Sequence, residues 1–165
     1  MEIDTLDVEI LKILQKDSRI PFTQIAKTLN VPDTTIHFRV RKLVEKGIIR
    51  KFTVAVSAEK LGYNALAMVR LMVGGHIVKD LTVKRTREIA ENLIKNDYIR
   101  LIGIGDEGNE VYLIAIARTN EELERIISGF RRSPDVQEVN VWYMNELLKG
   151  EEIIGLIPEI AEEER

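Results

Sequence analysis

Residues 21–30 read PFTQIAKTLN and residues 32–47 read PDTTIHFRVRKLVEKG, with one residue between the two stretches. Proline loses no hydrogen bond in the first turn of a helix, so Pro21 and Pro32 each mark the start of one. Gly47 is placed to end the second helix as its C′ residue. Two helices joined by so short a turn predict a helix-turn-helix.

A further helix is predicted before this pair, in residues 3–17, which read IDTLDVEILKILQKD. Asp4 is suited to be its N-cap, and Asp7 three residues later favours the amides of the first turn. In all three segments apolar residues recur at the spacing of one buried helix face. The predicted core positions are Leu6, Ile10, Ile13, Leu14, Ile25, Ala26, Leu29, Ile36, Val40, Leu43 and Val44.

The helix predicted at residues 33–46 carries the side chains best suited to contact DNA. Opposite its apolar stripe lie hydroxyls, an aromatic ring and cations, which match the groups that a major groove presents. We assign Arg41 to a base and Arg39, on the flank, to a phosphate. The competing interpretation is a solvated cationic face, but the short preceding helix and the tight turn favour DNA. The predicted DNA-contacting residues are Thr34, Thr35, His37, Phe38, Arg39, Arg41, Lys42, Lys46, Arg50 and Lys51.

Charge and composition support a DNA-binding surface and argue against an enzyme. The net charge is −3, yet residues 34–51 contain six basic residues and one acidic residue. A local basic stretch on an acidic protein predicts one surface for double-stranded DNA. Cysteine is absent and the only histidines are His37 and His76, so we expect no metal site, no cofactor and no catalytic residues. We assign His76 to plain surface.

The sequence also predicts where the protein works. The acidic N-terminus lacks the apolar core of a secretory signal. No apolar run approaches the ~20 residues that span a bilayer. We therefore expect a cytoplasmic protein that does not enter a membrane. After Gly47, residues 48–56 alternate enough to predict a strand, which would be a wing or a connecting strand beside the DNA-binding helices.

The C-terminal half alternates strands and helices. Strands are predicted at 65–73, 98–105, 109–117 and 136–144, and helices at 81–97 and 120–132, the second with Asn120 as its N-cap. This βαββαβ order predicts an antiparallel sheet with both helices on one face. The other face is left bare although it carries apolar residues, which predicts a homodimer. The predicted inward helical residues are Ile89, Ala90, Leu93, Ile94, Leu123, Ile126, Ile127 and Phe130.

Residues 103–108, GIGDEG, fit the G-x-G-x-x-G spacing of a dinucleotide-binding loop. Such a loop must open a helix, whose N-terminus holds the phosphate, whereas here the apolar run NEVYLIAIA predicts a strand. Asp106 and Glu107 would also place two negative charges against a pyrophosphate. The motif therefore predicts a strand-turn-strand connection, with glycines that either serve the turn alone or also line an effector site.

Taken together, these motifs resemble the Lrp/AsnC family, the leucine-responsive or feast/famine transcriptional regulators. The similarity covers residues 3–148 and is most specific from Thr35 to Ile49, with KLGY, the IGIGD turn and SPDVQEV as further matches. The resemblance implies an α+β chain with a winged helix-turn-helix at 1–52, a connecting strand and hinge at 53–63, a ferredoxin-like domain at 64–148 and an acidic tail at 149–165. It also implies a homodimer, higher oligomers such as octamers, and regulation by a small effector such as an amino acid.

The effector loop departs from the family pattern. The family loop usually reads Gly-Asp-Tyr-Asp, and only Gly105 and Asp106 match. Since Glu107 and Glu110 add negative charge, we expect a basic effector such as lysine or arginine, or none. The predicted effector-binding residues are Gly103, Gly105, Asp106, Glu107, Gly108, Asn109 and Glu110.

Two other functions fit the same architecture. An architectural DNA-binding protein would use the helices without an effector. Siroheme decarboxylases are built similarly, and the region near the central hairpin here offers Tyr98 and Arg100 but no histidine. The sequence favours a transcriptional regulator over both.

Overall fold

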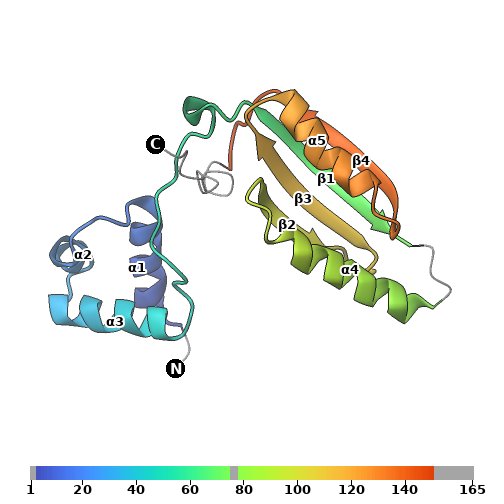
Figure 1. Cartoon of the computed structure of the whole chain (residues 1–165). Coiled ribbons are helices and arrows are strands. Elements are labelled where there is room, and N and C mark those ends of the chain that lie inside the picture. The colour runs from blue at the N-terminus through green and yellow to red at the C-terminus, as the bar shows by residue number, and fades with distance from the viewer. Residues whose placement is uncertain (1–2, 75–77, 151–165) are drawn as a thin grey trace, which may run out of the picture. The chain divides into compact units, whose positions relative to one another are not determined.

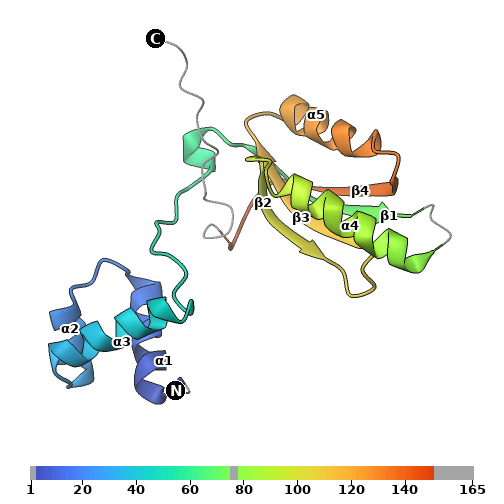
Figure 2. The ribbon, with the colours of Figure 1, turned by 60° about the horizontal axis from the view of Figure 1, so that its bottom comes forward.

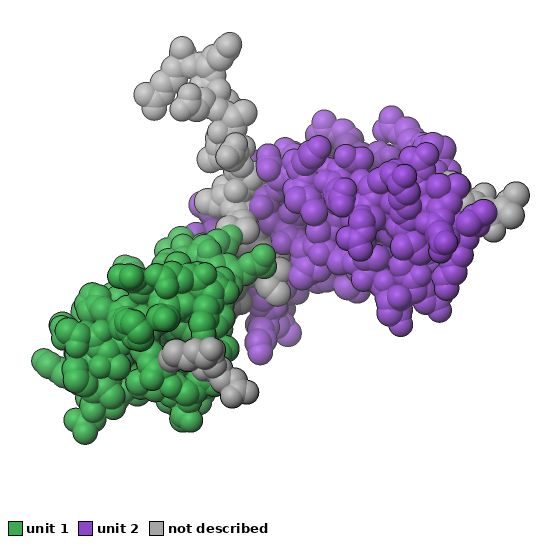
Figure 3. Space-filling model, turned by 90° about the horizontal axis from the view of Figure 1, so that it is seen from below, with its two compact units in different colours: residues 1–54 green, residues 55–165 purple. Residues whose placement is uncertain are grey.

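The chain forms two compact units, residues 1–54 and residues 55–165 (Figure 3). The computed structural model describes residues 3–74 and 78–150. His76 and all but the first two residues of the predicted acidic tail lie outside the described residues.

The first unit contains three helices, α1 (Thr5–Lys16), α2 (Phe22–Leu29) and α3 (Asp33–Glu45). Asp4 caps α1 in a reciprocal capping box with Asp7, and Asn30 takes the left-handed conformation that allows the tight turn after α2. The predicted helix-turn-helix is confirmed. Its buried core consists of Ile10, Leu14, Ile25, Ala26, Ile36, Val40 and Leu43.

The helix α3 ends where the sequence predicts, with Gly47 as its C′ residue. Gly47 has φ +68°, and its N–H donates to the carbonyl of Val44 while the N–H of Ile48 donates to that of Leu43. This pair of bonds is a Schellman motif, as a C′ glycine predicts. Val44 itself is 45% exposed, so its assignment to the core was wrong. The buried stripe of α3 contains fewer residues than predicted. It consists of Ile36, Val40 and Leu43, which pack with residues of α1 and α2 in one core.

The strand predicted at residues 48–56 does not form within the described chain. Residues 50–57 have no assigned strand, although Phe52 and Val54 are exposed apolar residues. A strand is stable only when a neighbour receives its hydrogen bonds, and alternating residues alone do not provide one.

The second unit is an antiparallel sheet with two helices. Its elements are β1 (Ala65–Val73), α4 (Lys79–Leu93), β2 (Ile99–Ile104), β3 (Glu110–Ala117), α5 (Asn120–Arg131) and β4 (Val136–Met144), after a short 3-10 helix η1 (Glu59–Leu61). The strand order is β2-β3-β1-β4, with β1 antiparallel to both β3 and β4 (Figure 1). This is the predicted βαββαβ arrangement.

Both helices lie on the same face of the sheet, as predicted (Figures 1 and 2). Their core contacts are with alternate residues of β1 and β3, from Ala65 to Leu71 and from Val111 to Ala117. Together these residues form the main core of the unit, because every second side chain of a strand points to one face.

Two details of the helices differ from the prediction. Ile94 is 65% exposed, and the buried face of α4 instead contains Thr82, Thr86 and Ala90. A buried threonine is tolerated there because the Thr86 hydroxyl donates to the Thr82 carbonyl at 2.9 Å. In α5 the N-cap is Thr119, whose hydroxyl accepts from the Glu122 N–H, rather than Asn120.

The face of the sheet opposite the helices is called the open face below. Met68, Tyr112 and Trp142 are exposed on it by 38%, 39% and 46%. The register places Arg70 between Tyr112 and Asn140 on the neighbouring strands. The open face therefore combines exposed apolar groups with a central charge.

Candidate nucleic-acid interface

The outward face of α3 presents the side chains that the sequence predicts for DNA. Thr34 and Phe38 are exposed, and the Lys42 ammonium lies 5.2 Å from the centre of the Phe38 ring. This cation–π contact holds a positive charge beside an exposed aromatic surface. The Arg41 Nε donates to Glu45 at 2.9 Å, and its side chain remains 80% exposed. An exposed pair of this kind opens at little cost, so Arg41 is available to a ligand.

The remaining predicted contacts lie around this centre. His37 is exposed and packs edge-on against the ring of Phe22 in α2, with ring centres 4.8 Å apart. Thr35 is half-buried on the same helix, and Lys46, Arg50 and Lys51 are exposed at its end and in the segment that follows. The His37–Phe22 contact connects α3 to α2.

Arg39 belongs to an ion-pair cluster that the sequence analysis does not predict. Its Nη1 donates to the carboxylates of Asp4, at 2.5 Å, and Asp7, at 3.2 Å, at the start of α1. The Arg39 side chain is only 19% exposed and that of Asp7 only 7%. This guanidinium is shared by two carboxylates and holds α3 against α1, so its assignment to a phosphate stays a prediction that would require these bonds to open.

The electrostatics of this contact follow from its geometry. The pKa of Asp4 is held below its usual value chiefly by the hydrogen bond from the Asp7 backbone and then by Arg39. The pKa of Arg39 is raised, chiefly by its hydrogen bond to Asp4. Both groups are thus charged under ordinary conditions. Helix-cap rules located Asp4 and Asp7, but no spacing in the sequence links them to an arginine over thirty residues away.

In the second unit, the glycine-rich segment is the predicted turn between strands. The Gly105 N–H donates to the Glu110 carbonyl and the Gly108 N–H donates to the Gly105 carbonyl. Gly108 has φ +76°, a conformation that side chains disfavour, and a Cβ there would meet Val83 of α4 at 3.1 Å. Both the backbone conformation and the close contact therefore favour glycine at this position. A strand rather than a helix follows, and the condition for binding a pyrophosphate is not met.

The predicted effector-binding residues of this turn do not act as one group. Asp106 and Glu107 are exposed, and the Asp106 carboxylate accepts from the Glu107 N–H. Glu110 instead turns to the open face, where it accepts from Arg70 and from the Tyr112 hydroxyl. These bonds, that of Tyr112 first, lower the pKa of Glu110. The expectation that Glu110 adds free negative charge to the turn is corrected, since Arg70 neutralises it.

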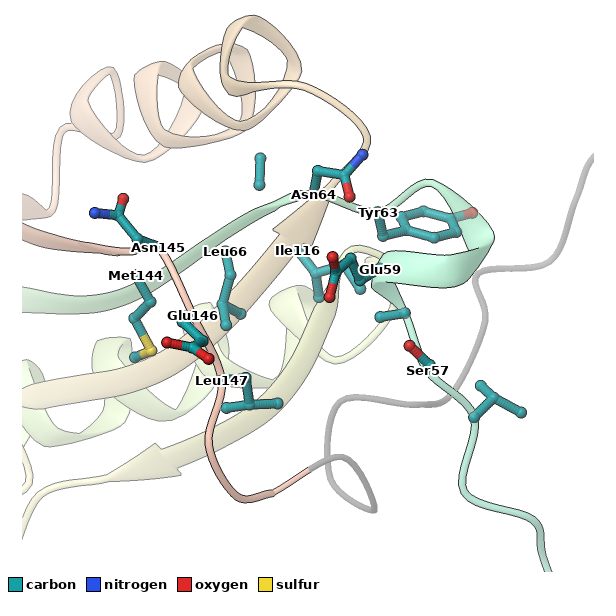
Figure 4. A pocket seen from close by; sticks show the side chains of 13 residues that line it. Ser57, Glu59, Tyr63, Asn64, Leu66, Ile116, Met144, Asn145, Glu146 and Leu147 are labelled. Carbon is teal, nitrogen blue, oxygen red and sulfur yellow. The ribbon is translucent and has the colours of Figure 1, made fainter.

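A pocket of about 640 Å³ lies at the end of the sheet where β1 begins and β4 ends (Figure 4). Leu66, Ile116 and Met144 give it an apolar floor, and Glu59 from η1 and Glu146 from the segment after β4 contribute carboxylates. Sequence reasoning missed this pocket because its lining comes from three separate parts of the chain, residues 56–66, Ile116 and residues 144–147. Only the sheet register brings them together.

The residues considered for a siroheme decarboxylase have structural partners. A hydrogen bond to Glu122 raises the pKa of Tyr98, and burial lowers the pKa of Arg100, whose guanidinium also donates to the Asp97 carbonyl. Within residues 3–74 and 78–150, no three histidine, aspartate or glutamate side chains gather as metal ligands would. None of the described helices is both long and apolar enough to cross a bilayer.

Comparisons with known proteins match both units. Residues 3–50 match the family described as winged helix-turn-helix DNA-binding, and residues 63–157 match the PF0864 C-terminal dimeric alpha+beta barrel domain. An uncharacterized HTH-type transcriptional regulator of Pyrococcus horikoshii is 36% identical over 151 residues, which cover 90% of this chain and 95% of the relative. One from Pyrococcus abyssi is 31% identical over 160 residues, covering 96% and 97%. Pyrococcus furiosus has at least three such relatives.

Solved structures agree with these matches. A Pyrococcus furiosus transcriptional regulatory protein of the AsnC family superposes with a TM-score of 0.79 at 27% identity, covering 96% of this chain and all of that one. A Neisseria meningitidis transcriptional regulator solved as an L-Met complex gives a TM-score of 0.77 at 17% identity, with coverage of 90% and 94%. At that identity the second likeness shows the fold alone.

Proposed function

This chain belongs to the Lrp/AsnC family of helix-turn-helix transcriptional regulators, and from that premise we propose that it binds specific double-stranded DNA as a homodimer in the cytoplasm. The observation that carries the proposal is that α3 has one arginine that anchors the helix and other polar and cationic side chains that remain exposed. Arg39 fixes the helix to α1, while Thr34, Phe38 and Arg41 face outward and stay exposed. A rigidly held helix with free polar and cationic groups is what base recognition in a major groove requires.

The homodimer is supported by the open face of the sheet. Exposed Met68, Tyr112 and Trp142 are costly to leave in water, and a second copy can cover them with the same residues. The family description of the second unit as a dimeric alpha+beta barrel domain agrees with this arrangement. Two copies would present two α3 helices to DNA, so the operator is expected to be pseudo-palindromic with half-sites ~34 Å or a multiple apart.

In vitro selection from random duplexes, followed by footprinting on the selected sites, tests this proposal. A regulator yields a pseudo-palindromic consensus and footprints confined to it. Even coating of every duplex would favour the architectural alternative instead. We propose no enzymatic role, and a purified protein that gains tetrapyrrole absorbance on addition of siroheme, and then converts it, would contradict that.

A small-molecule effector is the second part of the proposal, and the pocket at the β1–β4 end favours it. Its volume of about 640 Å³ lies in the range of ordinary ligand sites, and its lining, an apolar floor with five polar or charged side chains, is more polar than that of most of them. Glu59 and Glu146 favour a ligand with an amine group over an anion. One wall, residues 56–59, directly follows the DNA-binding unit along the chain, so an occupied pocket would stiffen the connection.

Calorimetry with the amino acids and simple amines tests this part and separates it from the turn at residues 105–110. Binding that is lost in Glu59→Gln and Glu146→Gln but kept in Asp106→Asn and Glu107→Gln would assign the effector to the pocket. The reverse pattern would assign it to the turn. No heat from any member of the series would remove the effector from the proposal.

A further inference from the structure

A continuous chain of hydrogen bonds crosses three strands on the open face. The Tyr112 hydroxyl donates to the Glu110 carboxylate at 2.5 Å, and Arg70 donates to the same carboxylate at 2.5 and 2.8 Å. Arg70 also donates to the Asn140 side chain at 3.2 Å, and Asn140 donates to Glu138 at 2.9 Å. These five residues are called the open-face network. It links β3, β1 and β4 side by side in the sheet.

The network lies among apolar groups that a partner must cover. Arg70 and Glu110 are already only 25% and 21% exposed, and Met68, Leu101 and Trp142 on the same face are 38–46% exposed. Covering such a face would remove the remaining water from the ion pair. Desolvation of a charge pair is unfavourable, and apolar side chains of similar volume would give an equally stable or more stable interface. Stability therefore does not explain the charges, whereas specificity does.

The network leaves two donors of Arg70 and one carboxylate oxygen of Glu138 without a hydrogen-bond partner among the described residues. A guanidinium has five N–H groups, and the bonds to Glu110 and Asn140 use three of those on Arg70. The other two have no acceptor among the described residues. Glu138 has a second carboxylate oxygen without a donor in the same part of the chain. A second copy presents the same surplus donors and acceptors, so a two-fold contact is self-complementary, and a face without the network would leave both groups buried and unpaired.

Such discrimination matters wherever several chains of this type occur together. The three relatives in Pyrococcus furiosus show that several regulators of this type occur in one organism. A purely apolar sheet face would pair with any of them, because hydrophobic contact has no direction.

We propose that the open-face network selects a second copy of this chain over related chains whose sheet face lacks it. This inference rests on the proposed homodimer. Beyond the homodimer, the inference names the residues that decide which chain is bound as partner. The proposed DNA contacts on α3 are not affected.

The test is a subunit-exchange experiment with the full chain and a variant in which the ion pair is apolar, Arg70→Met/Glu110→Leu. Each protein is first examined alone by sedimentation, then the two are mixed at equal concentration, allowed to exchange and analysed by native mass spectrometry. We expect both to be dimers alone and the mixed dimer to form at least about tenfold less often than the half expected for random pairing. The matched control Arg85→Met/Glu88→Leu removes an ion pair on α4, away from the open face, and is expected to mix randomly.

Random mixing of wild type with Arg70→Met/Glu110→Leu would overturn the inference while leaving the homodimer intact. A wild-type chain that sediments as a monomer at micromolar concentration would overturn the homodimer and the inference together. If the double variant does not fold, the same exchange is made with Tyr112→Phe/Asn140→Leu, which removes the hydrogen bonds on either side of the ion pair and keeps the ion pair itself.

Discussion

The outward face of α3 and the open face of the sheet both expose cations beside aromatic rings, but they hold the cations differently. The Arg41 side chain on α3 is 80% exposed and shares one hydrogen bond with a neighbour on the same helix. The Arg70 side chain on the sheet is 25% exposed and is fixed by residues of two neighbouring strands. A cation that contacts the phosphates or bases of DNA must remain accessible in the free protein. A cation that a protein partner covers must instead already have its hydrogen bonds within its own chain, because an unpaired buried charge is costly.

The strongest way to break this comparison is to place an unpaired charge on the open face. Trp142→Glu is expected to raise the dimer dissociation constant by at least about 100-fold, because a buried carboxylate without a partner costs several kcal/mol. Sedimentation equilibrium measures the change, and circular dichroism checks that the fold is kept. Ile94→Glu is the matched control, since Ile94, the C-cap residue directly after α4, is 65% exposed. Equal effects of the two substitutions would show that the open face is not the dimer interface.

A second prediction concerns the exposed cation on α3. Arg41→Ala is expected to weaken binding to the cognate operator by about 1–3 kcal/mol and to relax the preference at one base position. Lys12→Ala on α1 serves as the control, because it removes an exposed cation, also paired with a glutamate, from another helix. Titrations on a panel of operators with single base changes give both quantities. An unchanged affinity and preference would remove Arg41 from the residues that read bases.

Arg39 lies on α3 but is held like Arg70, so its loss should affect stability rather than the DNA contact. Arg39→Met is expected to lower the melting temperature of the first unit by several degrees at neutral pH. The salt dependence of DNA binding should stay the same, whereas a lost phosphate contact would reduce its slope by about one unit. A reduced slope with an unchanged melting temperature would support the phosphate assignment.

The same variant has a predicted pH dependence. Asp4 has a folded pKa below its ordinary value of 3.8, so its pairing adds stability above that value, and this stability is lost as pH falls through the lower folded pKa. Arg39 stays charged throughout, because its pKa is raised. The difference in melting temperature between wild type and Arg39→Met should therefore be full at pH 5–7 and shrink below pH 3.8.

The smallest expected effect comes from the partner of Arg41. Glu45→Gln removes an exposed i,i+4 pair, which is worth ~0.3–0.5 kcal/mol, so stability should hardly change. DNA affinity should rise about twofold on all sequences, since one negative charge leaves the helix that approaches the phosphates. Glu9→Gln on α1 is the control. A fall in affinity would mean that Glu45 positions Arg41 for its contact.

The sequence predicted the elements well where local rules decide them. Helix caps and apolar spacing located α1–α3 and the Gly47 terminus, and alternation located the four strands of the sheet. It failed where the outcome depends on a distant neighbour. The segment 48–56 alternates but has no strand beside it, and Ile94 fits the apolar period of α4 but lies beyond the edge of the core.

In the candidate sites, too, the features that depend on local sequence were predicted and those that depend on distant residues were not. The outward residues of α3 follow from one helical wheel, so Thr34, Phe38 and Arg41 were placed correctly on the exposed face. The ion pairs of Arg39 and Glu110 were not predicted because the charged partners are more than thirty residues away in the chain. Single-residue charge counts treat every ionised group as free, and only the tertiary structure shows which charges are already paired.

The central claim is that the outward face of α3 lies against bases of the operator, and site-specific photo-cross-linking tests it most directly. A photoreactive phenylalanine at position 38, where the side chain is 53% exposed, is irradiated in the complex with operator DNA, and position 8 on α1, 40% exposed, serves as the comparison. We expect base cross-links within each half-site from position 38 and none from position 8. Cross-links from position 8 without any from position 38 would contradict the claim.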